Sequence, residues 1–191
     1  MLNVTNKIRK LWWNTDNAYL ELDDSLNDKA QAWAEYIARK NVMKHGTYKD
    51  DLQTIVPYNK MNHGQNIAMQ GCSGKGCPDF LGTAKFAVRG WLVECNNCKK
   101  DVTSRCTERR PKKNAQDDNQ VGHFTQLIWR DATLLGVGRA VADDGTAYVV
   151  CNYDQGNIKR NRTTWSDENN MVSDEMINKF CKKIVKCVDE F

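Results

Sequence analysis

The sequence lacks the features that mark membrane proteins, multidomain chains and several large enzyme classes. Its opening, MLNVTNKIRKLWW, is too short and too polar for a signal peptide or a membrane span, and we expect no membrane span. No low-complexity run or long Pro/Gly/Ser linker divides the chain. The motifs Gly-x-Ser-x-Gly and His-Glu-x-x-His and a phosphate-binding glycine loop are all missing. These absences favour a single domain, and they place binding above catalysis.

Aromatic side chains are absent from the most basic segment. No Phe, Tyr or Trp lies between Leu92 and Gly122, although Lys and Arg residues crowd together from Lys99 to Lys113. A protein that binds single-stranded nucleic acid needs aromatic platforms beside its cations, and the net charge of +4 is modest, so nucleic acid is not an expected partner. We interpret the segment as a solvated loop, with binding to acidic glycans or lipid headgroups as the alternative.

Cysteine, by contrast, is abundant. The 191 residues include eight cysteines, and the hydrophobic share of 40% is enough for one core. Together with the glycosylation sequons at Asn3 and Asn161, the cysteines favour an oxidising, secretory compartment, and hence an extracellular protein whose leader has already been removed. Free thiols and chance sequons are the alternative. The cysteines expected to form disulfides are Cys72, Cys77, Cys95, Cys98, Cys106, Cys151, Cys181 and Cys187.

Apolar residues at three- and four-residue steps predict several amphipathic helices. They cover residues 3–14, residues 20–41, a segment that starts at Pro78 and leads to Glu94, and a last segment capped by Ser173 and Asp174. The small alanines of the second helix indicate that it is sandwiched between layers. The expected apolar stripes are Val4, Ile8, Leu11 and Trp12; Leu26, Ala30, Trp33, Ala34, Ile37 and Ala38; Phe80, Ala84, Ala87, Val88 and Trp91; and Val172, Met176, Phe180, Ile184 and Val188.

The stretch from Val121 to Asn157 is the central unit of the chain. The spacing of Val121, Phe124, Ile128, Ala132 and Leu135 predicts a helix that ends at Gly136. Two β-prone runs follow, residues 136–142 and 146–153, and the Asp-Asp-Gly turn signal between them predicts an antiparallel hairpin. His123 falls off the apolar stripe, which leaves its imidazole free to face a cleft.

Two segments of this unit carry a resemblance to a known family. GHFTQLIW, at 122–129, and YVVCNYDQGN, at 148–157, resemble the two signature motifs of the CAP superfamily of cysteine-rich secretory proteins, venom antigens, pathogenesis-related proteins and helminth venom allergen-like proteins. The resemblance covers about residues 3 to 160. It implies an α+β fold, a disulfide-stapled three-layer α-β-α sandwich around an antiparallel sheet. We therefore expect a CAP domain over 1–160 and a C-terminal extension over 161–191 with an amphipathic helix and two cysteines.

The resemblance also implies a cavity lined by His45, Gln65, Glu94 and His123. In the family the second position, in a Gly-Glu-Asn triplet, is glutamate, whereas this chain has Gly64-Gln65-Asn66. A first-helix histidine of the family pattern is also replaced, by Thr5, while Asn6 and Arg9 match. Without the family match, His45 reads as a surface or capping residue, and Glu94 reads equally well as an exposed carboxylate in a last helical turn.

A divalent metal, zinc or magnesium, is a possible but not a required cofactor of this cavity. Two neutral imidazoles and a carboxylate, those of His45, His123 and Glu94, can hold such an ion with one position open for water. Low pH should release it, because only neutral imidazole coordinates a metal. Glutamine cannot act as a general base, so a hydrolytic mechanism that needs paired carboxylates is not supported, and we expect no catalytic residues.

The cysteine spacing constrains the disulfides only in part. A Cys72–Cys77 bridge is favoured because glycines between them permit a small loop. One of Cys95, Cys98 and Cys106 is expected to reach Cys151 on the hairpin. Cys181 and Cys187 lie six residues apart, a rise of roughly 9 Å on a helix, so each pairs elsewhere or the helix breaks between them. Val137 stands where the family usually has a cysteine, so one common bridge is missing or rerouted.

The family resemblance implies that the protein binds small hydrophobic ligands, sterols or fatty acids, and acts on a host or partner cell. The loop that carries aromatics in sterol-binding members has none here, and a fatty-acid groove would lie between the first helix and the helix that opens at Val121, with contacts unknown. Two alternatives remain: an immune-modulating protein ligand that acts through its surface on a host or cell-surface protein, and a metal-dependent hydrolase.

Overall fold

The computed structural model describes residues 1–13, 19–71, 81–97, 121–156 and 181. Among these residues, no helix is both long and apolar enough to cross a bilayer. The expected last helix and the predictions for Cys72, Cys77, Cys98, Cys106, Cys187 and Asn161 lie outside the described residues. In chain order the elements are α1 (Leu2–Trp13), β1 (Glu21–Leu22), α2 (Asp24–Lys40), β2 (Gly46–Tyr48), β3 (Ile55–Pro57), a 3-10 turn (Tyr58–Lys60), β4 (Gly64–Gln70), α3 (Ala84–Val93), a second 3-10 turn (Glu94–Asn97), α4 (Gly122–Leu127), β5 (Leu134–Val141) and β6 (Ala147–Tyr153).

Four strands form the central sheet, in the order β1-β5-β6-β4. β6 pairs antiparallel with both β4 and β5, and the short β1 pairs parallel with β5. β2 and β3 form a separate two-stranded antiparallel sheet. The predicted hairpin is confirmed, because β5 and β6 pair through the turn at 143–145, where Gly145 has a φ of 87°.

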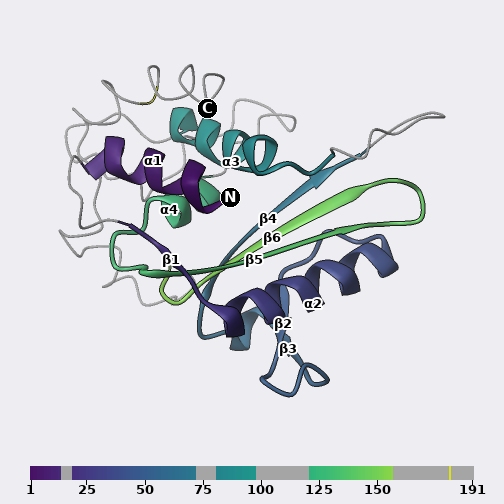
Figure 1. Cartoon of the computed structure of the whole chain (residues 1–191). Coiled ribbons are helices and arrows are strands. Elements are labelled where there is room, and N and C mark those ends of the chain that lie inside the picture. Colours follow the sequence, from purple (N-terminus) through teal and green to yellow (C-terminus); the bar gives the residue numbers. More distant parts are fainter. Residues whose placement is uncertain (14–18, 72–80, 98–120, 157–180, 182–191) are drawn as a thin grey trace.

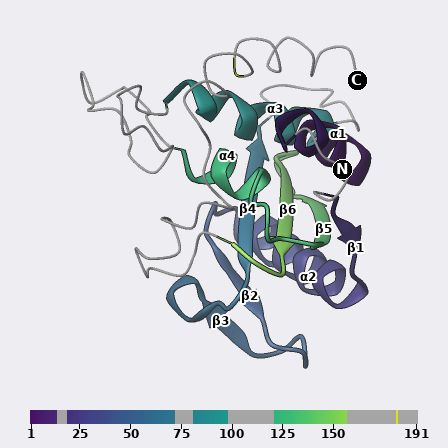
Figure 2. The same cartoon turned by 90° about the vertical axis from the view of Figure 1, so that its left-hand side faces the viewer.

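Helices cover both faces of the central sheet. Figures 1 and 2 show α2 on one face, and α1, α3 and α4 gathered on the other. The alternation of β6 explains the two cores: Val149, Cys151 and Tyr153 pack with α1, α3 and α4, whereas Tyr148 and Val150 pack with α2. The three-layer α-β-α sandwich expected from the sequence is confirmed.

Helix α2 contacts the sheet at very short range. All six residues of its predicted stripe are buried, which confirms that prediction. A Cβ at Gly136 or Gly138 of β5 would collide with the α2 backbone, so these glycines allow the close approach. Beyond the end of β1, two α2 side chains bond to the β5 backbone: Asn27 Oδ1 accepts from Val137 N at 2.8 Å, and Gln31 Oε1 accepts from Arg139 N at 3.0 Å. The two amides thereby take the place of a neighbouring strand.

The buried side of α1 differs from the predicted stripe. Ile8 and Trp12 are buried as expected, but Leu11 is 41% exposed, and Thr5 and Arg9 are buried instead. The prediction for Leu11 is wrong. The sequence pattern predicts that charged residues lie at the surface, but Arg9 has hydrogen-bond partners inside the protein, so the buried face of α1 includes Arg9 and leaves out Leu11. Asn3 is exposed on this helix, and its glycosylation stays a prediction.

Helix α4 is much shorter than the predicted helix over 121–135. It ends at Leu127, and Leu135 and Gly136 belong to β5. The reason lies in Arg9, whose guanidinium donates to the carbonyl oxygens of Leu127, Trp129, Arg130 and Ala132 at 3.3, 2.7, 3.3 and 2.8 Å. Four carbonyl groups converge on this one buried cation, whereas in a continuous helix the carbonyls would all point along the helix axis.

Helix α3 starts later than the predicted Pro78. Its N-cap is Thr83, whose side chain accepts from Phe86 N at 3.1 Å, and the described residues just before it are not helical. Of the described residues of the predicted stripe, Ala87, Val88 and Trp91 are buried as expected, and Ala84 is half-buried.

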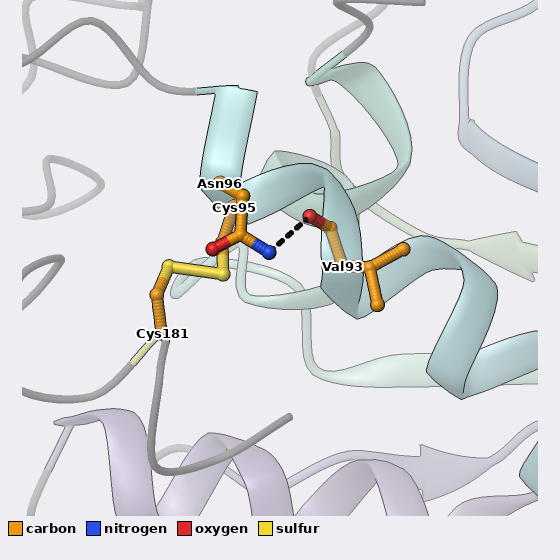
Figure 3. Close-up of a disulfide and its surroundings, with 4 residues drawn as sticks. All are labelled: Val93, Cys95, Asn96 and Cys181. Atoms are coloured by element: carbon orange, nitrogen blue, oxygen red, sulfur yellow. Dashed lines mark hydrogen bonds between the residues drawn. A yellow bond between two sulfur atoms is a disulfide. The ribbon is translucent and has the colours of Figure 1, made fainter. Parts of the chain in front are cut away.

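One disulfide joins Cys181 to the helical layer formed by α1, α3 and α4. Cys95, which is fully buried in the 3-10 turn after α3, bonds to Cys181 across 86 residues, with their Cα atoms 5.9 Å apart (Figure 3). Asn96, beside it, donates to Val93 O at 3.0 Å and continues the end of the helix (Figure 3). The expected bridge to Cys151 is wrong, because Cys151 is a buried free thiol. Burial raises the pKa of Cys151 to about 12, so this thiol is unreactive.

Candidate functional site

Four side chains from four segments meet at the start of β4. His45 lies just before β2, Gln65 lies on β4, Glu94 follows α3, and His123 lies in the first turn of α4. The centroids of the His45 and His123 rings are 6.3 Å apart, with an interplanar angle of 30°. Gln65 contacts the first ring and Glu94 contacts the second. The structure therefore brings together all four residues named from the sequence, which we call the His45–His123 cluster.

The His45 half of the cluster is held by amides. Gly46 N donates to Gln65 Oε1 at 3.3 Å, and Gln65 Nε2 donates to Gly46 O at 2.7 Å and to Asn152 Oδ1 at 3.0 Å. The Gly46 backbone thus determines which end of the Gln65 amide is oxygen. That oxygen lies 2.8 Å from His45 Nδ1, so Nδ1 carries the proton, and Nε2 of the neutral ring keeps its lone pair.

The His123 half is held by a carboxylate. Glu94 Oε1 lies 2.7 Å from His123 Nδ1, while Oε2 accepts from the backbone N–H groups of His123 at 2.9 Å and Phe124 at 3.2 Å. The N-cap residue of α4, Val121, offers no capping side chain, so Glu94 serves as the cap of this helix from another segment. Its oxygens are thereby engaged, and His123 Nε2 is the ring nitrogen left available.

Aromatic and amide neighbours fix the two rings further. Trp91 stacks on His123 with centroids 6.3 Å apart, and its Nε1 donates to Ile67 O at 3.1 Å. Asn66 Nδ2 donates to His123 O at 3.0 Å. On the other side, the Tyr58 ring lies 5.1 Å from the His45 ring. The cluster is therefore supported by side chains of β4, α3 and the 3-10 turn after β3.

Burial favours neutral imidazole at His45. Desolvation lowers the pKa of His45, the hydrogen bond with Gln65 opposes this shift, and the nearby charge of His123 adds to it. A neutral ring is the form that coordinates a metal.

Metal binding at this cluster would rest on the two imidazoles. The described residues contain no group of three or more His, Cys, Asp or Glu side chains arranged to hold a metal ion. The three-residue set of His45, Glu94 and His123 is not prearranged, because the Glu94 oxygens turn toward backbone N–H groups and His123 Nδ1. The donors left for an ion would be the two Nε2 atoms, because Gln65 and Glu94 hold the Nδ1 atoms.

A third histidine lies near the cluster and was not predicted from the sequence. His63 immediately precedes β4 and is 6% exposed. Burial, together with the positive charge of Lys29, lowers the pKa of His63 to about 4, and an interaction with the Asn152 side chain opposes the shift. Asn152, which bonds to Gln65, was equally overlooked. The adjacency of His63 to the Gly64-Gln65-Asn66 triplet was the one available signal.

Comparison with known proteins decides the family. The model of the cysteine-rich secretory protein family, CAP, matches residues 2–153. The chain belongs to the CAP family. Members of this family are generally not enzymes. The Cys95–Cys181 disulfide is consistent with the oxidising compartment in which secreted relatives fold.

Among its CAP relatives are venom and plant-defence proteins. Scoloptoxin SSD552 of Scolopendra dehaani is 29% identical over 161 residues, which cover 82% of this chain and 67% of that protein. Pathogenesis-related leaf protein 4 of Solanum lycopersicum is 34% identical over 91 residues, 48% of this chain, and the match spans only 46% of that protein. The solved structure of Schistosoma mansoni venom allergen-like protein 4 has a TM-score of 0.53 at 19% identity, covering 82% of this chain and 86% of that one. This last likeness shows the fold alone.

The CAP motifs also supply the frame beneath the cluster. Gln126 of the first motif is fully buried, and its Nε2 donates to Gln155 O at 3.0 Å. Its side chain fills the space beside Gly64 and Gly156, where a Cβ on either glycine would collide with it. The two glycines therefore make room for the side chain that ties α4 to the ends of β4 and β6.

Proposed function

We propose that this protein is a secreted, non-enzymatic CAP protein whose His45–His123 cluster binds a divalent metal ion and whose apolar surface binds a sterol or fatty acid. The observation that carries the metal proposal is the matched orientation of the two rings. In each ring an acceptor holds Nδ1, His45 through Gln65 and His123 through Glu94, and Nε2 is left as the donor atom. Two preoriented imidazoles are the beginning of a metal site with open positions.

Zinc fits this donor set better than magnesium does. Imidazole nitrogen suits zinc, whereas magnesium prefers oxygen ligands and keeps its water. When bound, the ion would supply open coordination positions for water or a ligand group. His45 and His123 would hold it, and Gln65 and Glu94 would keep the rings in place.

Isothermal titration with zinc tests the metal proposal. We expect one ion per chain, and at least a tenfold loss of affinity in His45→Ala and in His123→Ala, because each removes one of two nitrogen ligands. Lys44→Ala, next to His45 and exposed, is the matched control and should bind as the parent does. Binding of equal strength in all four proteins would place the ion elsewhere.

The lipid proposal is supported by family membership and by exposed apolar side chains on α1 and α3. Leu11 on α1 is 41% exposed, and Phe86 and Val93 on α3 are 39% and 37% exposed. The predicted groove between α1 and α4 has less support, because Trp12 and Phe124, both fully buried, pack edge to face with centroids 5.1 Å apart.

Uptake of labelled sterol and labelled fatty acid tests the lipid proposal. We expect saturable uptake that falls severalfold in Leu11→Glu and Phe86→Glu, with Leu22→Glu on the edge strand β1 as control. Uptake no greater than that of an unrelated secreted protein would reject the lipid and favour a protein ligand that acts through its surface on a host or cell-surface protein.

The cluster gives no support to a hydrolase. Gln65 is not a base, and both oxygens of Glu94 already accept hydrogen bonds, so neither side chain is placed to activate water. Measurable turnover that chelation abolishes and that Glu94→Ala removes would overturn this assignment.

A further inference from the structure

His63 and Asn152 are two buried polar residues behind the cluster with hydrogen-bonding capacity to spare. His63 Nδ1 lies 3.3 Å from Asn62 Oδ1, whereas His63 Nε2 has no hydrogen-bond partner among the described residues. Asn152 is fully buried, its Oδ1 accepts from Gln65 Nε2, and its Nδ2 likewise has no partner in the described part of the chain. A buried polar group without a partner destabilises the folded protein.

The two unpaired atoms are complementary. If Nδ1 of His63 carries the proton and donates to Asn62, Nε2 is an acceptor, and Asn152 Nδ2 is a donor. The Asn152 side chain lies near His63, because it acts on the pKa of the ring against the effect of burial. Pairing them, in contact or through one buried water, satisfies both atoms.

We propose that His63 is a positioning residue of the His45–His123 cluster, acting on the His45 ring through the Asn152 and Gln65 amides. In this chain His45 Nδ1–H donates to Gln65 Oε1, and Gln65 Nε2 donates to Asn152 Oδ1. The proposal adds a third bond, from Asn152 Nδ2 to His63 Nε2, directly or through one buried water. All three bonds run in one direction, from His45 to His63, so each amide is oriented by its neighbours.

His63 acts on the orientation of Asn152, where it reinforces the Gly46 backbone that already directs the Gln65 amide. If Asn152 turned over, its Nδ2 would face Gln65 Nε2, donor against donor, and one arm of the Gln65 amide would be lost. An acceptor at His63 Nε2 favours the correct orientation. Gln65 then keeps its oxygen at His45 Nδ1, and His45 Nε2 remains available as an acceptor.

Nitrogen-15 NMR of the histidine rings tests this assignment with no metal present. In the parent protein we expect His63 to carry its proton on Nδ1 with an accepting Nε2, and His45 to show a slowly exchanging Nδ1 proton. His63→Phe keeps an apolar ring in the buried space but removes the acceptor, so we expect the His45 Nδ1 proton to exchange about tenfold faster. His63→Gln restores an acceptor and should recover most of the protection.

Lys29→Met is the matched control, because it removes the charge near His63 but leaves the chain of hydrogen bonds intact. An unchanged His45 proton in a folded His63→Phe protein, or a His63→Gln protein that behaves like His63→Phe, would overturn the proposal. If His63→Phe does not fold, the parent protein decides, since a proton on His63 Nε2 is incompatible with the proposed direction. Scalar coupling between Asn152 Nδ2 and His63 Nε2 identifies direct contact, and a long-lived water signal beside His63 identifies the bridge; both support the assignment.

The consequence for metal binding rests on the proposed function, whereas the positioning does not. If both hold, His63→Phe also weakens zinc binding by about tenfold. Zinc binding that is absent from the parent, with the His45 proton still sensitive to His63, would reject the metal and retain the positioning role.

Discussion

The two imidazoles of the His45–His123 cluster reach the same orientation by different chemistry. His45 is held by Gln65, which is 4% exposed and belongs to a chain of neutral amides inside the sheet layer. His123 is held by Glu94, a carboxylate that also caps α4, and the two side chains are 17% and 13% exposed. A neutral acceptor suffices where the surrounding backbone determines its direction, and a charged one is placed where helix N–H groups and solvent stabilise it. With glutamine at position 65, an uncharged acceptor holds Nδ1 of His45.

Removal of the disulfide next to Glu94 is expected to have the largest effect and to affect the two histidines unequally, because no disulfide among the described residues adjoins His45. We expect Cys95→Ala or Cys181→Ala to lower the free energy of unfolding by about 4 kcal/mol, since the bond joins residues 86 positions apart. Urea unfolding measures the change, and NMR of the two Nδ1 protons should show the His123 proton losing protection before that of His45.

Cys151→Ala is the control for that experiment. It removes a sulfur from the same core without breaking the bond, and we expect a loss of about 1 kcal/mol. A loss as large as that of Cys95→Ala would show that core packing, not the covalent link, is what was measured.

Lowering the pH is expected to destabilise the part of the protein around His45, Gln65 and Asn152. Burial holds the pKa of His63 at about 4 and lowers the pKa of His45. Below the ordinary histidine pKa of about 6.5, the unfolded chain therefore binds more protons than the folded one, until the buried rings also become protonated. The free energy of unfolding is therefore expected to fall as the pH drops from about 6.5 to about 4, by up to about 3 kcal/mol from His63. Urea unfolding at several pH values measures this slope, and His63→Phe should flatten it. An equal slope in that variant would assign the effect to other groups.

Replacement of Glu94 tests the carboxylate-held half. Glu94→Ala leaves the first N–H groups of α4 without a cap and releases His123 Nδ1, so we expect a loss of about 2 kcal/mol in unfolding free energy. Glu94→Gln keeps one acceptor oxygen and should lose about half as much. Thermal unfolding compares the two variants, and equal losses would mean that the negative charge, not the capping geometry, matters.

Replacing Gln65 by glutamate would give both histidines a carboxylate partner, and we expect a smaller loss of unfolding free energy. Gln65→Glu removes the donors to Gly46 O and Asn152 Oδ1 and sets oxygen against oxygen, so we expect a loss of about 1 kcal/mol near pH 7. This environment raises the pKa of the new carboxyl group, so the deficit should shrink as the pH falls and the group becomes protonated. Unfolding at pH 7 and pH 5 measures it; a deficit that grows on acidification would contradict the assigned hydrogen bonds.

Much of the fold could be predicted from local pattern. The buried residues of α2 and the β5–β6 hairpin follow the sequence periodicity, because each packs against one face along its whole length. The helix predicted over 121–135 failed for the opposite reason. Ile128, Ala132 and Leu135 have helical spacing, but a cation supplied by α1 determines the path of the chain after Leu127.

The site was predictable only where family motifs carried it. His45, Gln65, Glu94 and His123 lie far apart in the sequence, and the motif resemblance, not their spacing, grouped them. His63 and Asn152 act through the pairing of Gln65 with Asn152 across β4 and β6, a register that no single-sequence pattern specifies. The Cys95–Cys181 bond was out of reach for a similar reason, since eight cysteines permit about 105 complete pairings.

Arg9 has a consequence for how the chain reaches its native state. Its four carbonyl partners lie 118 to 123 residues further along the sequence, so the first helix cannot find its contacts until the ribosome has released residue 132. Closing so long a segment is slow compared with local helix formation. Helix α1, although made before its partners, is thus expected to dock late, and removing residues 1–9 would leave the turn beyond α4 without the cation that shapes it.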